Sequence, residues 1–98
     1  MNVEDPQDSE DERLVREKIK SALLEIVDSK QIGYLEWTVH NLINLVRRNK
    51  ELSDDLLQKL ILRQIFNTCD KSKVRQTPLV SKRILNLLRT YVSGARAA

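Results

Sequence analysis

The sequence predicts an all-α domain, a small four-helix bundle of the orthogonal or the up-and-down type. Apolar residues recur at three- and four-residue intervals over four separate stretches, a spacing that places them on one side of a helix. The 98 residues include only two glycines and two prolines, too few for the closely spaced turns of an all-β domain. Hydrophobic residues make up 41% and charged residues 32%, a balance typical of a folded globular domain.

The length of the chain suits one domain with a single core. We expect a disordered acidic tail over residues 1–8, the four-helix domain over residues 9–94, and a short C-terminal tail over residues 95–98. No internal repeat is evident, and the apolar spacing does not persist as the heptads of a coiled coil.

The first half of the chain predicts two helices. Ser9 and Glu12 form a capping box, which predicts that the first helix covers residues 10–28. Its inward-facing residues are Val15, Ile19, Ala22, Leu23, Ile26 and Val27. After a loop over residues 28–33, a second helix is predicted over residues 34–49. Its inward-facing residues are Leu35, Val39, Leu42, Ile43 and Val46.

The second half predicts two more helices. Ser53 is a predicted N-cap for a helix over residues 54–69. This helix has two apolar faces, because Leu57 and Leu60 centre one face while the later residues Leu62, Ile65, Phe66 and Cys69 point to nearly the opposite side. A polar loop over residues 70–76 follows. Thr77 and Pro78 predict an N-cap and a first helical residue, and Gly94 predicts the end of that helix after Ser93.

The residue types that catalysis requires are scarce. The one histidine, His40, falls on the polar side of its helix, where a solvated position is expected. Cys69, the one cysteine, belongs to an apolar stripe, where burial disfavours a reactive thiolate. One histidine and one cysteine cannot supply a zinc site, and no glycine-rich phosphate loop is present. We therefore expect no enzymatic activity, no metal, no cofactor and no small-molecule substrate.

Charge is unevenly distributed along the chain. The first twelve residues contain six of the 14 acidic residues and no Lys or Arg, so the rest of the chain carries all 17 basic residues. Such a basic domain attracts anionic partners. No apolar stretch is long enough to cross a membrane, and the acidic N-terminus is unlike a targeting segment. These features predict an intracellular protein, and we expect it in the nucleus.

Two surfaces suggest a protein partner. Trp37 points away from the apolar stripe of its helix, and it either faces solvent or is covered by a loop or the N-terminal segment. The second apolar face of helix 54–69 either belongs to the core or forms a groove for an acidic or amphipathic-helical segment of another protein. We therefore predict a non-catalytic interaction domain of a nuclear protein, which binds its partner through helical surfaces with basic rims. The predicted partner-binding residues are Trp37, Asn41, Asn44, Arg48, Leu62 and Phe66.

The alternative function is binding of DNA or RNA by the basic face of the last helix and the loop before it. Arginine and asparagine on such a face can contact phosphates and base edges. The candidate residues are Lys71, Lys73, Arg75, Lys82, Arg83, Asn86 and Arg89. Against this function, the loop of about seven residues is longer than in a helix-turn-helix motif. A solvated polar helix face also explains the same pattern.

Overall fold

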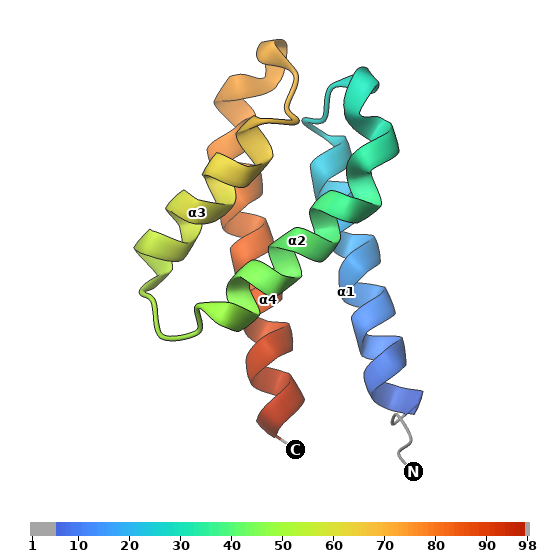
Figure 1. Ribbon diagram of the computed structural model, residues 1–98, viewed down its shortest axis with the longest axis vertical. Coiled ribbons are helices and arrows are strands. Elements are labelled where there is room, and N and C mark those ends of the chain that lie inside the picture. The colour runs from blue at the N-terminus through green and yellow to red at the C-terminus, as the bar shows by residue number, and fades with distance from the viewer. Residues whose placement is uncertain (1–5, 98) are drawn as a thin grey trace.

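The chain folds into four α-helices that enclose one hydrophobic core. A computed structural model describes residues 6–97, with side chains described for residues 10–92 (Figure 1). The helices are α1 (Pro6–Leu24), α2 (Leu35–Arg48), α3 (Asp54–Phe66) and α4 (Thr77–Ala97), and two 3-10 helices, η1 (Ser29–Tyr34) and η2 (Lys71–Gln76), precede α2 and α4. The predicted all-α, four-helix fold is confirmed.

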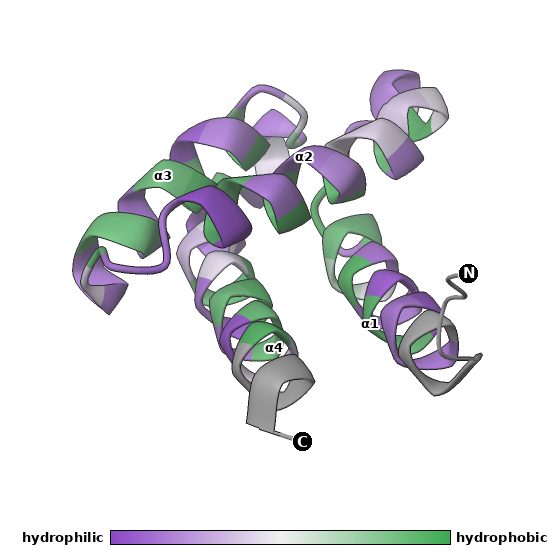
Figure 2. Ribbon diagram, turned by 60° about the horizontal axis from the view of Figure 1, so that its bottom comes forward, coloured by the Kyte–Doolittle hydropathy of each residue, from purple (hydrophilic) through white to green (hydrophobic). Residues whose placement is uncertain are grey.

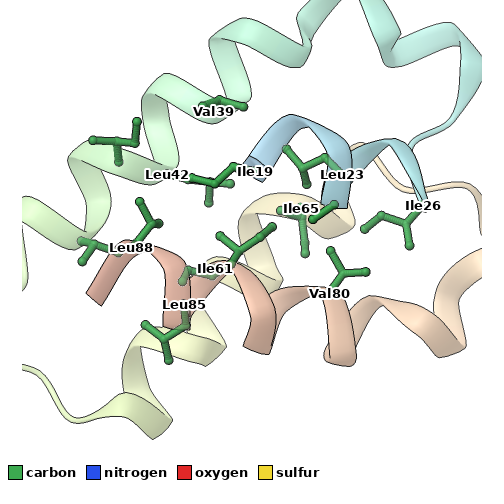
Figure 3. Close-up of a cluster of buried hydrophobic side chains, with 14 of the residues drawn as sticks. Ile19, Leu23, Ile26, Val39, Leu42, Ile61, Ile65, Val80, Leu85 and Leu88 are labelled. Carbon is green, nitrogen blue, oxygen red and sulfur yellow. The ribbon is translucent and has the colours of Figure 1, made fainter. Parts of the chain in front are cut away.

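Helix α4 is the centre of the packing, because it packs most extensively on α1 and α3 and also contacts α2. Hydrophobic and hydrophilic residues alternate along the helices, as expected where each helix buries one side (Figure 2). The buried side chains are almost all aliphatic, and Figure 3 shows them converging from all four helices. The largest fully buried side chains are Ile19, Leu23, Ile26, Val39, Leu42, Ile43, Val46, Leu57, Ile61, Ile65, Ile84 and Leu88.

The molecule consists of two similar halves, α1–η1–α2 and α3–η2–α4, in which each residue of the second half lies 42 positions after its counterpart in the first. The buried residues of α2 are Leu35, Thr38, Val39, Leu42, Ile43 and Val46. Their counterparts in α4 are Thr77, Val80, Ser81, Ile84, Leu85 and Leu88, and all six are also buried. Helices α2 and α4 therefore contribute the same set of positions to the core, whereas α1 and α3 share only two, those of Ile19 and Ile61 and of Leu23 and Ile65.

No internal repeat is evident in the sequence, and the similarity of the two halves is found in the order of their elements. Few counterparts are identical, although Ile19 matches Ile61 and Asp28 matches Asp70. Elsewhere a polar residue replaces an apolar one, as where Ser81 is the counterpart of Val39. Between α2 and α4, the halves agree in which positions are buried rather than in which residues occupy those positions.

The two halves are joined where their loops meet. The amide of Asp28 donates a hydrogen bond to the carbonyl oxygen of Thr68 (2.9 Å), and the amide of Asp70 donates one to that of Ile26 (2.7 Å). Between these bonds, Val27 and Cys69 form an isolated antiparallel bridge. Asp28 and Asp70 are counterparts, and so are Ile26 and Thr68. Exchanging the halves converts one hydrogen bond into the other, so the bridge has local two-fold symmetry.

Each aspartate of the bridge also begins a 3-10 helix. The Asp28 carboxylate accepts a hydrogen bond from the amide of Lys30 (2.9 Å), and the Asp70 carboxylate accepts one from the amide of Ser72 (2.9 Å). The hydrogen bonds from Ser72 lower the pKa of Asp70 below its ordinary value. Both loops therefore adopt the same capped turn, and the two predicted irregular loops are instead short 3-10 helices.

The ends of α1 differ from the predicted boundaries of residues 10 and 28. The helix begins at Pro6, a residue favoured in the first helical turn because the amide hydrogen it lacks would have no helical partner. The predicted tail therefore has residues 6–8 in the helix, and its residues 1–5 lie outside the described part of the chain. The helix ends at Leu24, because the next residues leave it to form the bridge.

The ends of α4 also differ from the prediction. Thr77 is not an N-cap, because it is fully buried and its hydroxyl donates a hydrogen bond back to the carbonyl oxygen of Lys73 (3.2 Å). The preceding 3-10 helix leads directly into α4 and makes a separate cap unnecessary. At the other end, Gly94 lies within α4, which continues to Ala97 and into the predicted C-terminal tail.

The register of α3 also requires a correction. Its buried residues are Leu57, Ile61 and Ile65, spaced four apart, whereas Leu60 is only partly buried. The buried face of α3 is therefore rotated relative to the predicted face centred on Leu57 and Leu60, because the helix presents one continuous apolar stripe to α4. The predicted N-cap is confirmed: the hydroxyl of Ser53 accepts a hydrogen bond from the amide of Leu56 (3.3 Å).

The duplication extends to an ion pair that holds each half together. Arg47 and Arg89 are counterparts, as are Glu12 and Asp54. A nitrogen of Arg47 lies 3.6 Å from an oxygen of Glu12, and the Nε of Arg89 donates to Asp54 at 2.9 Å. Arg89 also donates to two carbonyl oxygens of the α2–α3 loop, those of Lys50 (3.0 Å) and Leu52 (2.6 Å).

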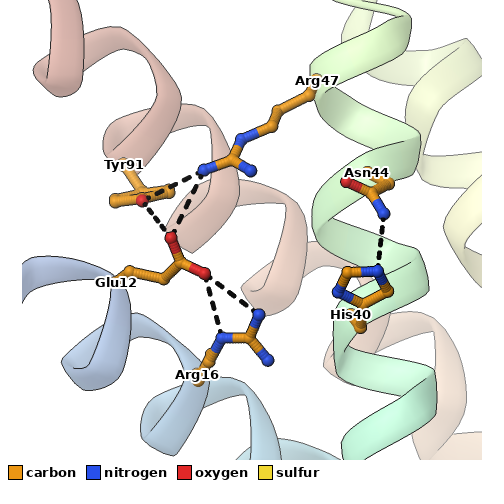
Figure 4. Close-up of polar contacts among 6 residues, drawn as sticks. All are labelled: Glu12, Arg16, His40, Asn44, Arg47 and Tyr91. Carbon is orange, nitrogen blue, oxygen red and sulfur yellow. Dashed lines mark hydrogen bonds and ion pairs between the residues drawn. The ribbon is translucent and has the colours of Figure 1, made fainter. Parts of the chain in front are cut away.

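Glu12 is the centre of a polar cluster that joins α1, α2 and α4 (Figure 4). Its carboxylate accepts hydrogen bonds from Arg16 (3.0 and 3.2 Å) and from the hydroxyl of Tyr91 (3.2 Å). Burial alone would raise the pKa of Glu12, but these hydrogen bonds and the charges of Arg16 and Arg47 outweigh burial, and the pKa lies below its ordinary value. Burial and the Glu12 charge raise the pKa of Tyr91.

The α3 register predicts that Ile61→Ala destabilises the protein far more than Leu60→Ala. Ile61 is fully buried, so its truncation should cost about 2 to 5 kcal/mol of unfolding free energy. Leu60 is partly exposed, and its truncation should cost about half as much or less. Urea denaturation of both variants measures the difference. A larger loss for Leu60→Ala would show that the register is wrong.

The Glu12 cluster predicts a stability difference that depends on pH. Because the folded-state pKa is depressed, the stabilisation is present above the ordinary value of 4.5 and disappears as pH falls through the folded pKa. Glu12→Gln should therefore cost about 1 kcal/mol at neutral pH and progressively less under acid conditions. Denaturation across pH measures this, with the exposed Glu51→Gln as control. A difference that does not change with pH would contradict it.

Candidate functional site

Groups for catalysis or metal binding do not converge in the described part of the chain. No set of three or more His, Cys, Asp or Glu residues is arranged there to hold a metal ion. His40 is exposed, as predicted, with its Nε2 3.0 Å from the amide nitrogen of Asn44 (Figure 4). Cys69 is half-buried in the bridge between the halves. None of the helices in residues 6–97 has the length and apolar content needed to cross a membrane.

Exposed apolar residues instead gather at one end of the molecule. We call this end the loop end. It comprises residues 24–37 and 66–79, where α1 and α3 finish, the two 3-10 helices lie, and α2 and α4 begin, at the top of Figure 1. Nine large hydrophobic side chains are exposed among the described residues, and seven of them belong to the loop end. These seven are Leu24, Ile32, Tyr34, Trp37, Phe66, Val74 and Leu79.

Six of these seven residues form counterpart pairs in the two halves. We define the first apolar edge by three residues: Leu24, the last residue of α1; Ile32, in η1; and Trp37, in the first turn of α2. Their counterparts make up the second apolar edge: Phe66, Val74 and Leu79. The most exposed members are Trp37 (62%) and Leu79 (69%), which are counterparts.

Helix geometry explains why these side chains point outward. Leu24 and Phe66 directly follow the buried residues Leu23 and Ile65, and one residue along a helix turns the side chain by about 100°. Trp37 precedes the buried pair Thr38 and Val39 and is turned away from the core in the same manner. Trp37 thus faces solvent, the first of the two predicted arrangements, and nothing in the described residues covers it.

The two edges differ in charge. Residues 24–37 contain Glu25, Asp28 and Glu36 but only one base, Lys30. Glu36 is paired with Lys20, whose hydrogen bond lowers the pKa of the carboxyl, and Glu36 in turn raises the pKa of Lys20. The second edge is basic: the segment 66–83 contains only one acid, Asp70, against five basic residues. These are Lys71, Lys73, Arg75, Lys82 and Arg83.

The predicted partner-binding residues do not form one site. Trp37 and Phe66 are exposed at the loop end. Arg48 is exposed too, but it ends α2, eleven residues or roughly 16 Å along the axis from Trp37. The remaining three, Asn41, Asn44 and Leu62, are only partly accessible. Of the second apolar face predicted for α3, only Phe66 is an exposed apolar side chain.

The predicted nucleic-acid residues divide into two groups. Lys71, Arg75, Lys82 and Asn86 are exposed. The other three, Lys73, Arg83 and Arg89, have partners within the protein. Arg83 forms two hydrogen bonds with Glu25 (2.9 and 3.0 Å), Lys73 lies 3.4 Å from the carbonyl oxygen of Glu25, and Arg89 holds the α2–α3 loop.

Five residues of the loop end were not predicted from the sequence: Leu24, Ile32, Tyr34, Val74 and Leu79. The spacing of apolar residues predicts core positions within a helix, but it says little about helix ends and loops, where these five residues lie. One pattern could have revealed them. Ile32 and Val74 are apolar residues at the same position of two polar loops, each four residues after an aspartate.

Comparison with known proteins assigns no family to this chain. No protein-family model, no curated protein and no solved structure matches it. The proposals that follow therefore rest on the residues, contacts and charges of the loop end.

Proposed function

We propose that this chain is a protein-interaction domain that binds a partner protein through the loop end. The observation that supports this most strongly is the gathering of seven exposed, large apolar side chains at one end of a small domain. Exposed apolar patches on soluble proteins commonly mark sites of association, because covering them removes apolar surface from water. The expectations that the protein is nuclear and has no enzymatic activity remain predictions.

The composition of the loop end suits a protein partner. Trp37, Tyr34 and Phe66 are of the residue types enriched in the centres of protein interfaces, where large rings supply contact area with few rotatable bonds. The charged residues lie around them, as in an interface whose rim is polar. A partner that covers the loop end would gain affinity mainly from the apolar side chains, while the charges would set its orientation and association rate.

Nucleic-acid binding is the less favoured function. Three of its seven predicted residues are engaged within the protein, and Arg89 in particular connects α4 to the α2–α3 loop. Binding to phosphates would therefore rest on Lys71, Arg75 and Lys82, a small number of contacts. The apolar side chains beside them would gain nothing from a phosphate backbone.

The proposed function predicts that Trp37→Ala/Leu79→Ala removes partner binding without unfolding the domain. Both side chains are largely exposed, so their truncation should change stability by about 0.5 kcal/mol or less. Loss of two interface anchors should weaken binding at least tenfold, that is by about 2 kcal/mol or more. Quantitative capture of proteins from a nuclear extract, followed by calorimetry with the partner that is captured, measures the effect.

The matched control is Leu14→Ala/Leu56→Ala. These residues are counterparts, each 49% exposed, and they lie outside the loop end. The control should capture the same proteins as the unmodified chain. Equal loss in both double variants would argue against the loop end as the site. Capture that disappears on nuclease treatment and survives both double variants would favour the nucleic-acid function instead.

A further inference from the structure

We infer that the second apolar edge binds an acidic amphipathic helix of the partner protein, whereas the first edge does not accept one. This inference rests on the proposed function and makes it more specific. The partner's helix would place its apolar side on Phe66, Val74 and Leu79 and its carboxylates beside Lys71, Arg75 and Lys82.

Charge complementarity supports this choice of partner. Lys71, Arg75 and Lys82 are exposed, and none of them has an ion-pair partner among the side chains of residues 10–92. The one acid of the segment, Asp70, uses its carboxylate to cap η2. The second edge therefore carries three basic side chains available to a ligand, and carboxylates on a partner would supply the missing counter-charges.

The first edge has a different character, although the fold places its residues in the same positions. In the first half, the counterparts of Lys71, Lys73 and Arg75 are Ser29, Gln31 and Gly33, respectively. The acids of this segment, Glu25 and Glu36, are paired with Arg83 and Lys20, and Lys30 is its one base, so the first edge offers few counter-charges to a negatively charged helix. The same apolar pattern with different charged neighbours allows the two edges to distinguish between partners, because the second edge offers three free basic side chains to a negatively charged helix and the first edge has only Lys30.

A helix suits the second edge better than an added strand does. Strand addition needs an exposed sheet edge, and the described residues contain a single bridge rather than a strand. An amphipathic helix needs only exposed apolar side chains with charges beside them, and the second edge provides both.

Residues 1–5 of the same molecule cannot be the ligand. The helix α1 has 19 residues and separates them from the loop end by about 28 Å along its axis. Five residues span at most about 18 Å even when fully extended.

The test is a selection of peptides against the full chain. The displayed library contains amphipathic helical peptides of about 16 residues, long enough for four turns. Their apolar face is constant, and their polar positions are randomised among Asp, Glu, Lys, Arg and Gln. We expect enrichment of Asp and Glu, and we expect a selected peptide to shift the amide NMR signals of Phe66, Val74 and Leu79.

Two sets of variants identify the groups responsible. Lys71→Gln/Arg75→Gln/Lys82→Gln should weaken binding of the selected acidic peptide about tenfold at low salt, with the difference shrinking as salt is added. Lys18→Gln/Arg48→Gln/Lys59→Gln removes three exposed bases from elsewhere and should leave the affinity unchanged. Phe66→Ala/Leu79→Ala should weaken the binding at least tenfold at any salt concentration.

Several outcomes would overturn the inference. Enrichment of peptides without a preference for Asp and Glu would refute it and leave the proposed function intact. The same holds for acidic peptides that shift the amide NMR signals of Leu24, Ile32 and Trp37 instead. So would a concentration-dependent dimer, seen by light scattering, whose interface covers the second edge. If no peptide is enriched and a mixed pool of nucleic acids binds instead, both the inference and the proposed function are wrong.

Discussion

The arrangement of the molecule depends on the two hydrogen bonds that join Asp28 to Thr68 and Asp70 to Ile26. They hold the ends of α1 and α3 beside each other, and they place both aspartates where each caps the following 3-10 helix. The starts of α2 and α4 are thereby brought to the same end of the molecule. Without this bridge, the core would still favour helix packing, but only the contacts of Lys73 and Arg83 with Glu25 would link the two halves at the loop end.

The two halves have kept one set of features and diverged in another. Both halves have the same capped turn, an ion pair between an arginine of the second helix and an acid of the first, and the same exposed apolar positions. Helices α2 and α4 also share their buried positions. The charges around the apolar edges differ. This division is physically reasonable, because core positions must fit one another, whereas exposed residues are free to change with the ligand.

Much of the fold could be predicted from the sequence, because its helices have one apolar side each. The α2 stripe from Leu35 to Val46 and the Ser53 cap are as predicted. The start of α4 was not predicted correctly, because the sequence suggests that Thr77 is an N-cap, whereas its side chain packs in the core. Whether Leu60 or Ile61 is buried depends on the angle at which α3 meets α4, and periodicity within one helix does not define that angle.

The candidate site was harder to predict than the fold. Trp37 and Phe66 stood out as single residues, but their neighbours in space come from other segments of the chain. The correspondence of Trp37 with Leu79, and of Leu24 with Phe66, becomes visible only when the two halves are recognised as counterparts. That recognition required the bridge between Val27 and Cys69, which pairs two segments far apart in the sequence.

Hydrogen exchange at the amides of Asp28 and Asp70 is the most direct test of this account. Each amide donates across the bridge, so both should be protected, and to a similar degree, because the two bonds are related by the local two-fold symmetry. Exchange that requires unfolding of the whole domain would support the paired arrangement of the loop end. Exchange at either amide as fast as in an unstructured peptide would contradict it.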